Sequence, residues 1–103
     1  MTTISYKHSG NDFSLVIKGH AGYNPGNDIV CAACSALAYT AAENILRFKD
    51  IKQSVNFDDG LCEITVTAEK ATTRKRIKNI FDIFMRGYNL IARTYPDNVK
   101  IIF

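Results

Sequence analysis

A cysteine and a histidine in the first third of the chain have the types and the spacing for nucleophilic chemistry. Cys31 lies one turn inside a predicted helix that begins near Asp28, and His20 ends the predicted strand before it. A thiolate near a helix N-terminus is stabilised by the helix dipole and by free backbone N–H groups. A histidine within reach can accept the thiol proton, as in a cysteine hydrolase. Cys31 and His20 are the predicted catalytic pair, and no metal or cofactor is expected.

The segment between these two residues, 21–26, contains two glycines and a proline. We expect a flexible loop that closes over a substrate, with Gly22, Tyr23 and Gly26 close to the site. A lone histidine at a strand end is more often structural or solvated than catalytic. The glycines that flank it, Gly19 and Gly22, favour the functional interpretation. Gly19, Gly22, Tyr23 and Gly26 are therefore candidate supporting or substrate-binding positions.

Asp28 and Ser35 share the Cys31 face of the predicted helix, three residues before and four after it. Asp28 has two interpretations that both stay open: it caps the helix, or it orients His20 or binds substrate. For Ser35 we favour a packing role with its hydroxyl bonded to a helix carbonyl, although it stays a candidate site residue. No third catalytic residue is assigned, and backbone N–H groups at the helix start, with or without amides of the preceding loop, are expected to hold the oxyanion.

Cys31 and Cys34 also form a C-x-x-C pair. A zinc site would need further ligands, with only Cys62 and a distant histidine to recruit, so this interpretation is weak. A thioredoxin-like redox pair is more serious, because that motif also lies where a strand enters a helix. The third interpretation makes Cys31 reactive and Cys34 a buried core thiol, because the dipole effect fades within about one turn. Cys62 reads as core.

Strands and helices must position these residues, and the apolar periodicity of the sequence predicts where those elements lie. It predicts strands at 3–7, 13–18, 54–57, 61–67 and 99–103 and helices at 28–48 and 70–94, with a hairpin turn at Asp58-Asp59-Gly60. The order β-β-α-β-β-α-β indicates an α+β fold, a mostly antiparallel five-stranded sheet with both helices on one face. The first helix is rich in alanine, so we expect it to be buried on most sides. The second helix has one apolar stripe.

Composition limits the remaining function classes. The chain has 103 residues, 47% hydrophobic and 22% charged, which predicts one folded domain over 1–103. The net charge of +3 and the basic cluster at 70–78 are mild, and no aromatic-basic signature accompanies them, so direct nucleic-acid binding is not expected. No window is expected to span a membrane, and no signal peptide is expected. Three cysteines favour reduced thiols and a cytoplasmic location.

The sequence Gly19-His20-Ala21, then Gly-Asn-Asp-Ile-Val-Cys-Ala at 26–32, then Ser-Ala-Leu at 35–37, resembles the ribosomal-processing cysteine protease family Prp. The likeness is close over 19–37 and extends to the whole chain in length and element order. It implies that the residues matching His20 and Cys31 are catalytic. Cys34 departs from the pattern, since a small apolar residue is expected there.

The resemblance also implies a cytoplasmic, homodimeric endopeptidase. Its substrate would be the N-terminal extension of the large-subunit ribosomal protein twenty-seven, cut after a pair of phenylalanines, and a pocket for aromatic side chains is therefore expected. Two other functions stay open. One is a thiol-disulfide oxidoreductase that uses Cys31 and Cys34, and the other is a non-enzymatic, ribosome-associated binding module that uses the basic helix.

Overall fold

The computed structural model describes residues 1–102, and its elements follow the predicted order. They are β1 (Thr2–Ser9), β2 (Asp12–Lys18), α1 (Ile29–Leu46), β3 (Lys52–Asp58), β4 (Leu61–Thr67), α2 (Ala71–Thr94) and β5 (Val99–Ile102). α1 begins just after the predicted residue because Asp28 is its N-cap, with a non-helical backbone. β1 and β3 extend further than predicted, since strand pairing continues through polar residues that alternation alone does not include.

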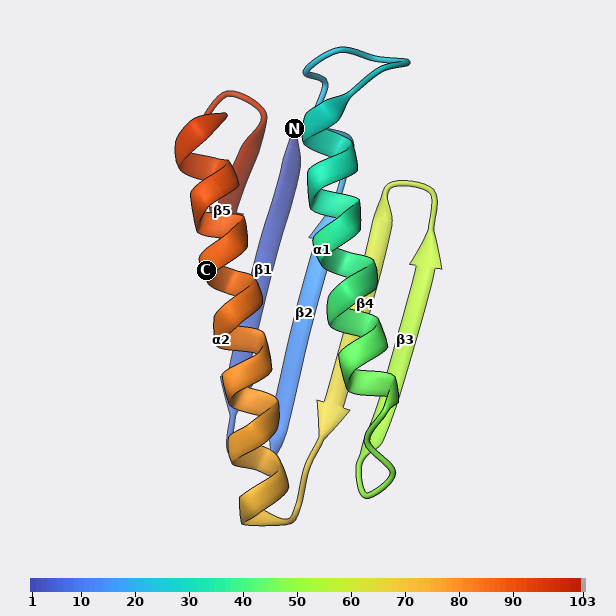
Figure 1. Ribbon diagram of the computed structural model, residues 1–103, viewed down its shortest axis with the longest axis vertical. Helices are drawn as coiled ribbons and strands as arrows, with labels where there is room; N and C mark the ends of the chain where they lie inside the picture. Colours follow the sequence, from blue (N-terminus) through green and yellow to red (C-terminus); the bar gives the residue numbers. More distant parts are fainter. Residues whose placement is uncertain (103) are drawn as a thin grey trace.

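The five strands form one sheet in the order β3-β4-β2-β1-β5. Every neighbouring pair is antiparallel except β1 and β5, which are parallel. Both helices lie side by side on one face of this sheet (Figure 1). The predicted mostly antiparallel α+β architecture is confirmed. The pairing of β2 with β4 matters most for function, because it brings the β3–β4 turn beside the end of β2.

The core lies between the sheet and the helices. Successive strand residues point to opposite faces, so alternate residues of β1, β2 and β4 face the helices. The fully buried side chains of this layer include Ile4, Leu15, Ile64, Ile45, Ile77 and Phe81. An aromatic stack of Tyr6, Phe81 and Phe13, with ring centroids 5.3 and 5.6 Å apart, joins β1 and β2 to α2. The other face of the sheet is uncovered, and residues such as Ser5, Lys7 and Ser14 occupy it.

The predicted apolar stripe of α2 is confirmed. Ile77, Phe81 and Tyr88 are buried, and the other members of the stripe, Ile80, Phe84 and Ile91, are half-buried against the core. Tyr88 also joins the two helices, because its hydroxyl donates a hydrogen bond of 3.0 Å to the Cys34 carbonyl oxygen. Gly87 permits this close approach, since a Cβ there would lie 3.0 Å from the Leu37 side chain.

The expectation that α1 is buried on most sides is wrong. Only six of its 18 residues are buried, and Ala32 and Ala36 are exposed. The helix rests on the sheet and contacts α2 on one side, which leaves its remaining surface open (Figure 1). α1 also has the length and mean hydropathy, 1.5, of a membrane-spanning helix, so the expectation that no window qualifies was wrong too. Its six buried residues belong to the core beneath it.

Candidate active site

The backbone around Gly19 places His20 at the end of β2. Gly19 donates its N–H to the Gly60 carbonyl oxygen at 2.8 Å, which ties this end to the β3–β4 turn. Its φ of +94° belongs to a region that favours glycine. A Cβ at this position would also collide with the carbonyl oxygen of Met1. Gly19 therefore supports His20 through the backbone, and it also lines the groove beside that histidine.

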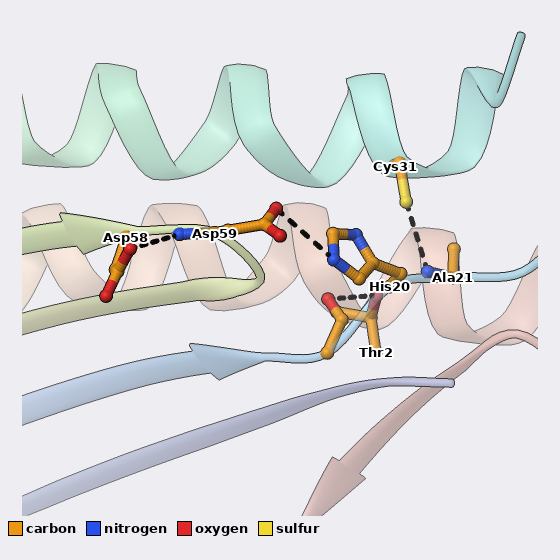
Figure 2. A network of polar contacts seen from close by, with 7 residues as sticks. Thr2, His20, Ala21, Cys31, Asp58 and Asp59 are labelled. Atoms are coloured by element: carbon orange, nitrogen blue, oxygen red, sulfur yellow. Dashed lines mark hydrogen bonds and ion pairs between the residues drawn. The ribbon is translucent and has the colours of Figure 1, made fainter. Parts of the chain in front are cut away.

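The Cys31 thiol points from the first turn of α1 toward the segment just after β2 that carries His20. Its Sγ accepts a hydrogen bond of 3.0 Å from the Ala21 N–H (Figure 2). The Ala21 peptide is fixed from the other direction as well, because the Asn98 side-chain amide donates to the Ala21 carbonyl oxygen at 3.0 Å. Within residues 1–102 no hydrogen bond joins His20 to Cys31. Such bonds are often long in enzymes without substrate, and both residues line the same cavities.

Asp28 occupies two of the N–H groups that were expected to be free at the start of α1. Its Oδ1 accepts from Val30 and Cys31 at 3.0 and 2.9 Å, and its Oδ2 accepts from Tyr23 and Asn24 at 2.8 and 3.2 Å. These four backbone donors, that of Cys31 foremost, lower the pKa of the Asp28 carboxyl below its usual value. The capping interpretation is confirmed. Of the helix-start donors expected to hold the oxyanion, the N–H groups of Val30 and Cys31 are therefore already engaged by Asp28.

The contact partner of His20 is Asp59, a residue that the sequence interpretation assigned only to a turn. His20 Nε2 lies 3.4 Å from Asp59 Oδ1. Figure 2 shows the imidazole between the Asp59 carboxylate of the hairpin turn and the Cys31 thiol of α1. The signal that could have found it is the pairing of β2 with β4, in which Lys18 opposes Leu61 and the turn reaches His20. Sequence periodicity does not reveal which strands pair.

Two cavities meet at His20 and Cys31. A groove of about 440 Å³ runs between α1 and the β3–β4 hairpin, and Ser35, Tyr39 and Phe57 are among its other lining residues. A second hollow of about 380 Å³ lies under the 22–28 loop. The imidazole and the thiol line both spaces. A peptide passing from one cavity to the other would therefore cross both groups.

The structure separates the other candidate residues. Gly22 and Gly26 line the hollow, as expected of loop residues near the site. Ser35 is exposed in the groove, and its hydroxyl makes no hydrogen bond within residues 1–102, so the favoured packing role is wrong. Its small side chain lies on the open side of α1. Tyr23 lines neither cavity, because its ring packs edge-on against Tyr95 at 5.2 Å.

Burial distinguishes the three free cysteines. Cys31 is half-buried and lines both cavities, whereas Cys34 and Cys62 are buried. Burial raises the pKa of each buried thiol to about 11, and for Cys34 the charges of Cys31 and Asp28 add to this effect. Cys31 is the thiol placed for chemistry. Among residues 1–102 no group of three or more His, Cys, Asp or Glu side chains is arranged to hold a metal ion.

The chain resembles known proteins in sequence pattern and in fold. The family model described as cysteine protease Prp matches residues 1–100. The chain is similar to the Staphylococcus aureus ribosomal processing protease Prp bound to a covalently linked product peptide, with 23% identity, a TM-score of 0.81 and coverage of 98% of this chain and 97% of that one. It is also similar to SMU.848 from Streptococcus mutans, with 25% identity, a TM-score of 0.66 and coverage of 99% and 94%. No curated protein matches the sequence.

Proposed function

The chain belongs to the Prp family of cysteine proteases, and we propose that Cys31 is its nucleophile and His20 its general base. One observation carries this assignment: the thiol and the imidazole both line the two cavities that meet at the end of β2. The runner-up, a Cys31–Cys34 redox pair, is disfavoured because Cys34 is buried beneath the helix.

The proposed reaction is acyl transfer through a thioester. His20 takes the proton of the Cys31 thiol, and the sulfur attacks the scissile carbonyl carbon. The C–N bond then breaks as His20 returns the proton to the leaving amine, and water hydrolyses the thioester. Ala21 is the proposed oxyanion donor, because its N–H lies 3.0 Å from the sulfur to which the tetrahedral carbon would be bonded. Asp28 cannot release its four donors without loosening the loop and the helix start.

The proposed substrate is the N-terminal extension of the large-subunit ribosomal protein twenty-seven, cut after an aromatic pair. Two exposed aromatic residues in the groove support it. Tyr39 of α1 and Phe57 of β3 stack with ring centroids 4.5 Å apart, although each is about half exposed. An aromatic side chain of a peptide would gain offset or edge contacts with this pair. The S. aureus relative has itself been solved with a substrate peptide.

Two further properties belong to the same proposal. We propose a homodimer, because the exposed Ile83 and Leu90 lie seven residues apart on one face of α2. We also propose that the protein works in the cytoplasm. Its three thiols are all free, a state that a reducing compartment maintains.

Cleavage of a synthetic peptide bearing the extension tests the catalytic assignment. We expect Cys31→Ala, Cys31→Ser and His20→Ala each to reduce turnover by roughly two or more orders of magnitude while the fold is kept. Cys34→Ala is the matched control one helical turn away and should keep most of the activity. If Cys34→Ala were folded and as inactive as Cys31→Ala, the oxidoreductase would replace the protease mechanism.

A further inference from the structure

We propose that Asp59 is a positioning residue that holds His20 with its Nε2 proton toward the Asp59 carboxylate. The other ring nitrogen, Nδ1, is then left to accept the proton of Cys31. This inference rests on the proposed catalytic pair and adds a third member to it. The contact that carries it is the 3.4 Å distance between His20 Nε2 and Asp59 Oδ1 (Figure 2).

The fold sets the position of Asp59 through the hairpin turn. β2 pairs with β4 up to the last residue of β2, and the Gly19 N–H bonds to the Gly60 carbonyl oxygen at 2.8 Å. Within the turn, Asp58 Oδ1 accepts the Asp59 N–H at 2.8 Å. The backbone on both sides of Asp59 is thus tied down, which places this residue beside the imidazole.

Gly60 lets the imidazole pack directly on this turn. A Cβ at Gly60 would lie 3.1 Å from His20 Nε2, closer than ordinary van der Waals contact, and the Gly60 φ of +64° favours glycine on its own account. The turn therefore supports one edge of the ring. Because that edge carries Nε2, the ring orientation and the Asp59 contact are fixed by the same piece of backbone.

The other nearby carboxylates are engaged elsewhere. Asp28 accepts four backbone N–H groups, and Asp58 accepts the N–H of the turn. Among residues 1–102 the only ion-pair contact of His20 is with Asp59. Asp59 is therefore the carboxylate that can select the protonation site of the ring.

The chemistry follows from the two nitrogens of imidazole. A neutral ring has one N–H donor and one acceptor, and a carboxylate beside Nε2 favours the tautomer with the proton there. Nδ1 then carries the lone pair that a general base needs. After proton transfer the ring is cationic, and the Asp59 carboxylate stabilises that charge. Both side chains are largely exposed, so a peptide that fills the groove would strengthen the contact by displacing water.

The test combines kinetics with nitrogen NMR on Asp59→Ala and Asp59→Asn. For Asp59→Ala we expect kcat to fall on the order of 10- to 100-fold, with KM changed less than about twofold, because the base is misoriented. Asp59→Asn should lose less, since its amide oxygen still accepts a hydrogen bond. Glu63→Gln is the control. Glu63 lies in the same hairpin but on the face of β4 that points away from the helices, so this substitution should leave kcat unchanged.

A tautomer measurement separates positioning from a merely structural role. At alkaline pH the 15N shifts of His20 should show the Nε2–H form in the wild type and a mixture in Asp59→Ala, while His8 serves as the internal reference. Unchanged His20 shifts, or an unchanged kcat, in folded Asp59→Ala would overturn the inference. Failure of the proposed Cys31–His20 assignment would be recognised separately, because Cys31→Ala or His20→Ala would then keep full activity.

Discussion

Cys31 and Cys34 lie one helical turn apart on α1 and have different chemistry because of burial. Cys31 opens onto both cavities, whereas Cys34 is 3% exposed and its pKa is raised to about 11. Thiol reactivity depends on the thiolate, and a group with that pKa is about one-thousandth ionised at pH 8. The departure of Cys34 from the family pattern therefore adds a core side chain without adding a second nucleophile.

Alkylation of the folded protein checks this difference. At pH 8 we expect iodoacetamide to modify Cys31 first and to leave Cys34 and Cys62 unmodified until the protein is denatured, because both pKa values are raised by burial. Peptide mass spectrometry after short exposure gives the site. Modification of Cys34 in the native state at the rate of Cys31 would contradict the assignment.

Tyr88 makes the buried polar contact between the helices. Its hydroxyl bonds to the Cys34 carbonyl oxygen at 3.0 Å, and burial raises the pKa of this phenol well above its usual range. We expect Tyr88→Phe to lower the free energy of unfolding by about 1 kcal/mol, the usual net worth of such a bond, and to leave kcat largely unchanged. Urea unfolding measures the loss. Tyr39→Phe, at an exposed tyrosine, is the control and should unfold like the wild type.

The sequence predicted the two reactive residues but not every residue that positions them. His20 and Cys31 stand out because glycines and a helix start flank them in the chain. Asp28 could be read as a cap, although the number of donors it occupies depends on how the 21–27 loop folds back. Asp59 could not be found, because 39 positions separate it from His20 and only strand pairing joins them.

The loop before α1 is an element held largely by one side chain. Asp28 bonds to Tyr23 and Asn24 as well as to the helix start, so the loop is tied to α1. Its glycines at 22 and 26 remain exposed. The expected closure over substrate stays a prediction, and these bonds confine it to the segments around the glycines.

Replacement of Asp28 tests this tether. We expect Asp28→Ala to speed hydrogen exchange at the Tyr23 and Asn24 amides, since they lose their acceptor. The pKa of Asp28 is lowered in the folded protein, so its stabilisation is present above the unfolded pKa, about 4, and is lost as pH falls through the lower folded pKa. The melting temperature of Asp28→Asn should therefore fall less between pH 5 and pH 3 than that of the wild type. Parallel curves of melting temperature against pH for Asp28→Asn and the wild type would contradict this account.

The two hairpin turns provide a matched pair of glycines. Gly10 in the β1–β2 turn and Gly60 in the β3–β4 turn have φ values of +57° and +64°, so alanine at either position is strained to a similar degree. Only Gly60 touches the site, since its Cβ would press on His20, whereas space around Gly10 is open.

We expect Gly10→Ala and Gly60→Ala to lower stability by a similar amount, about 1 kcal/mol, because of the positive φ. Peptide cleavage should fall only in Gly60→Ala, as the imidazole is displaced from its orientation. Equal activity in the two variants, compared at a temperature where both are folded, would show that the turn does not position His20.

The elements themselves were predictable because their periodicities are clear. Alternation in β2 and the stripe on α2 each reflect one buried face. The strand order was not, because β2 pairs with β4 and β1 pairs with β5, and these pairs join segments far apart in the chain. The burial of α1 was misjudged for a related reason. Its alanines permit close packing on every side, but the fold supplies neighbours on only two.

The molecule as a whole exposes more surface than its mass requires. The accessible area is 6322 Å² for 11.5 kDa, compared with about 5,800 Å² for a typical folded monomer of that mass. Its extents of 43 × 23 × 17 Å describe a thin slab, one sheet with one helical layer (Figure 1). A slab with apolar side chains on its outer helical surface gains stability by pairing with a second copy.

The proposed homodimer places Ile83 and Leu90 of α2 against their counterparts, since a two-fold interface uses the same patch on both subunits. Each is 57% exposed in the single chain. Light scattering at micromolar concentration should give twice the chain mass of 11.5 kDa. Ile83→Arg and Leu90→Arg should shift the protein toward the single-chain mass, because charge at the centre of an apolar interface is desolvated without a partner. Leu46→Arg changes an equally apolar, half-exposed residue at the far end of α1 and should leave the mass unchanged. A wild-type protein that scatters as one chain would rule out this dimer.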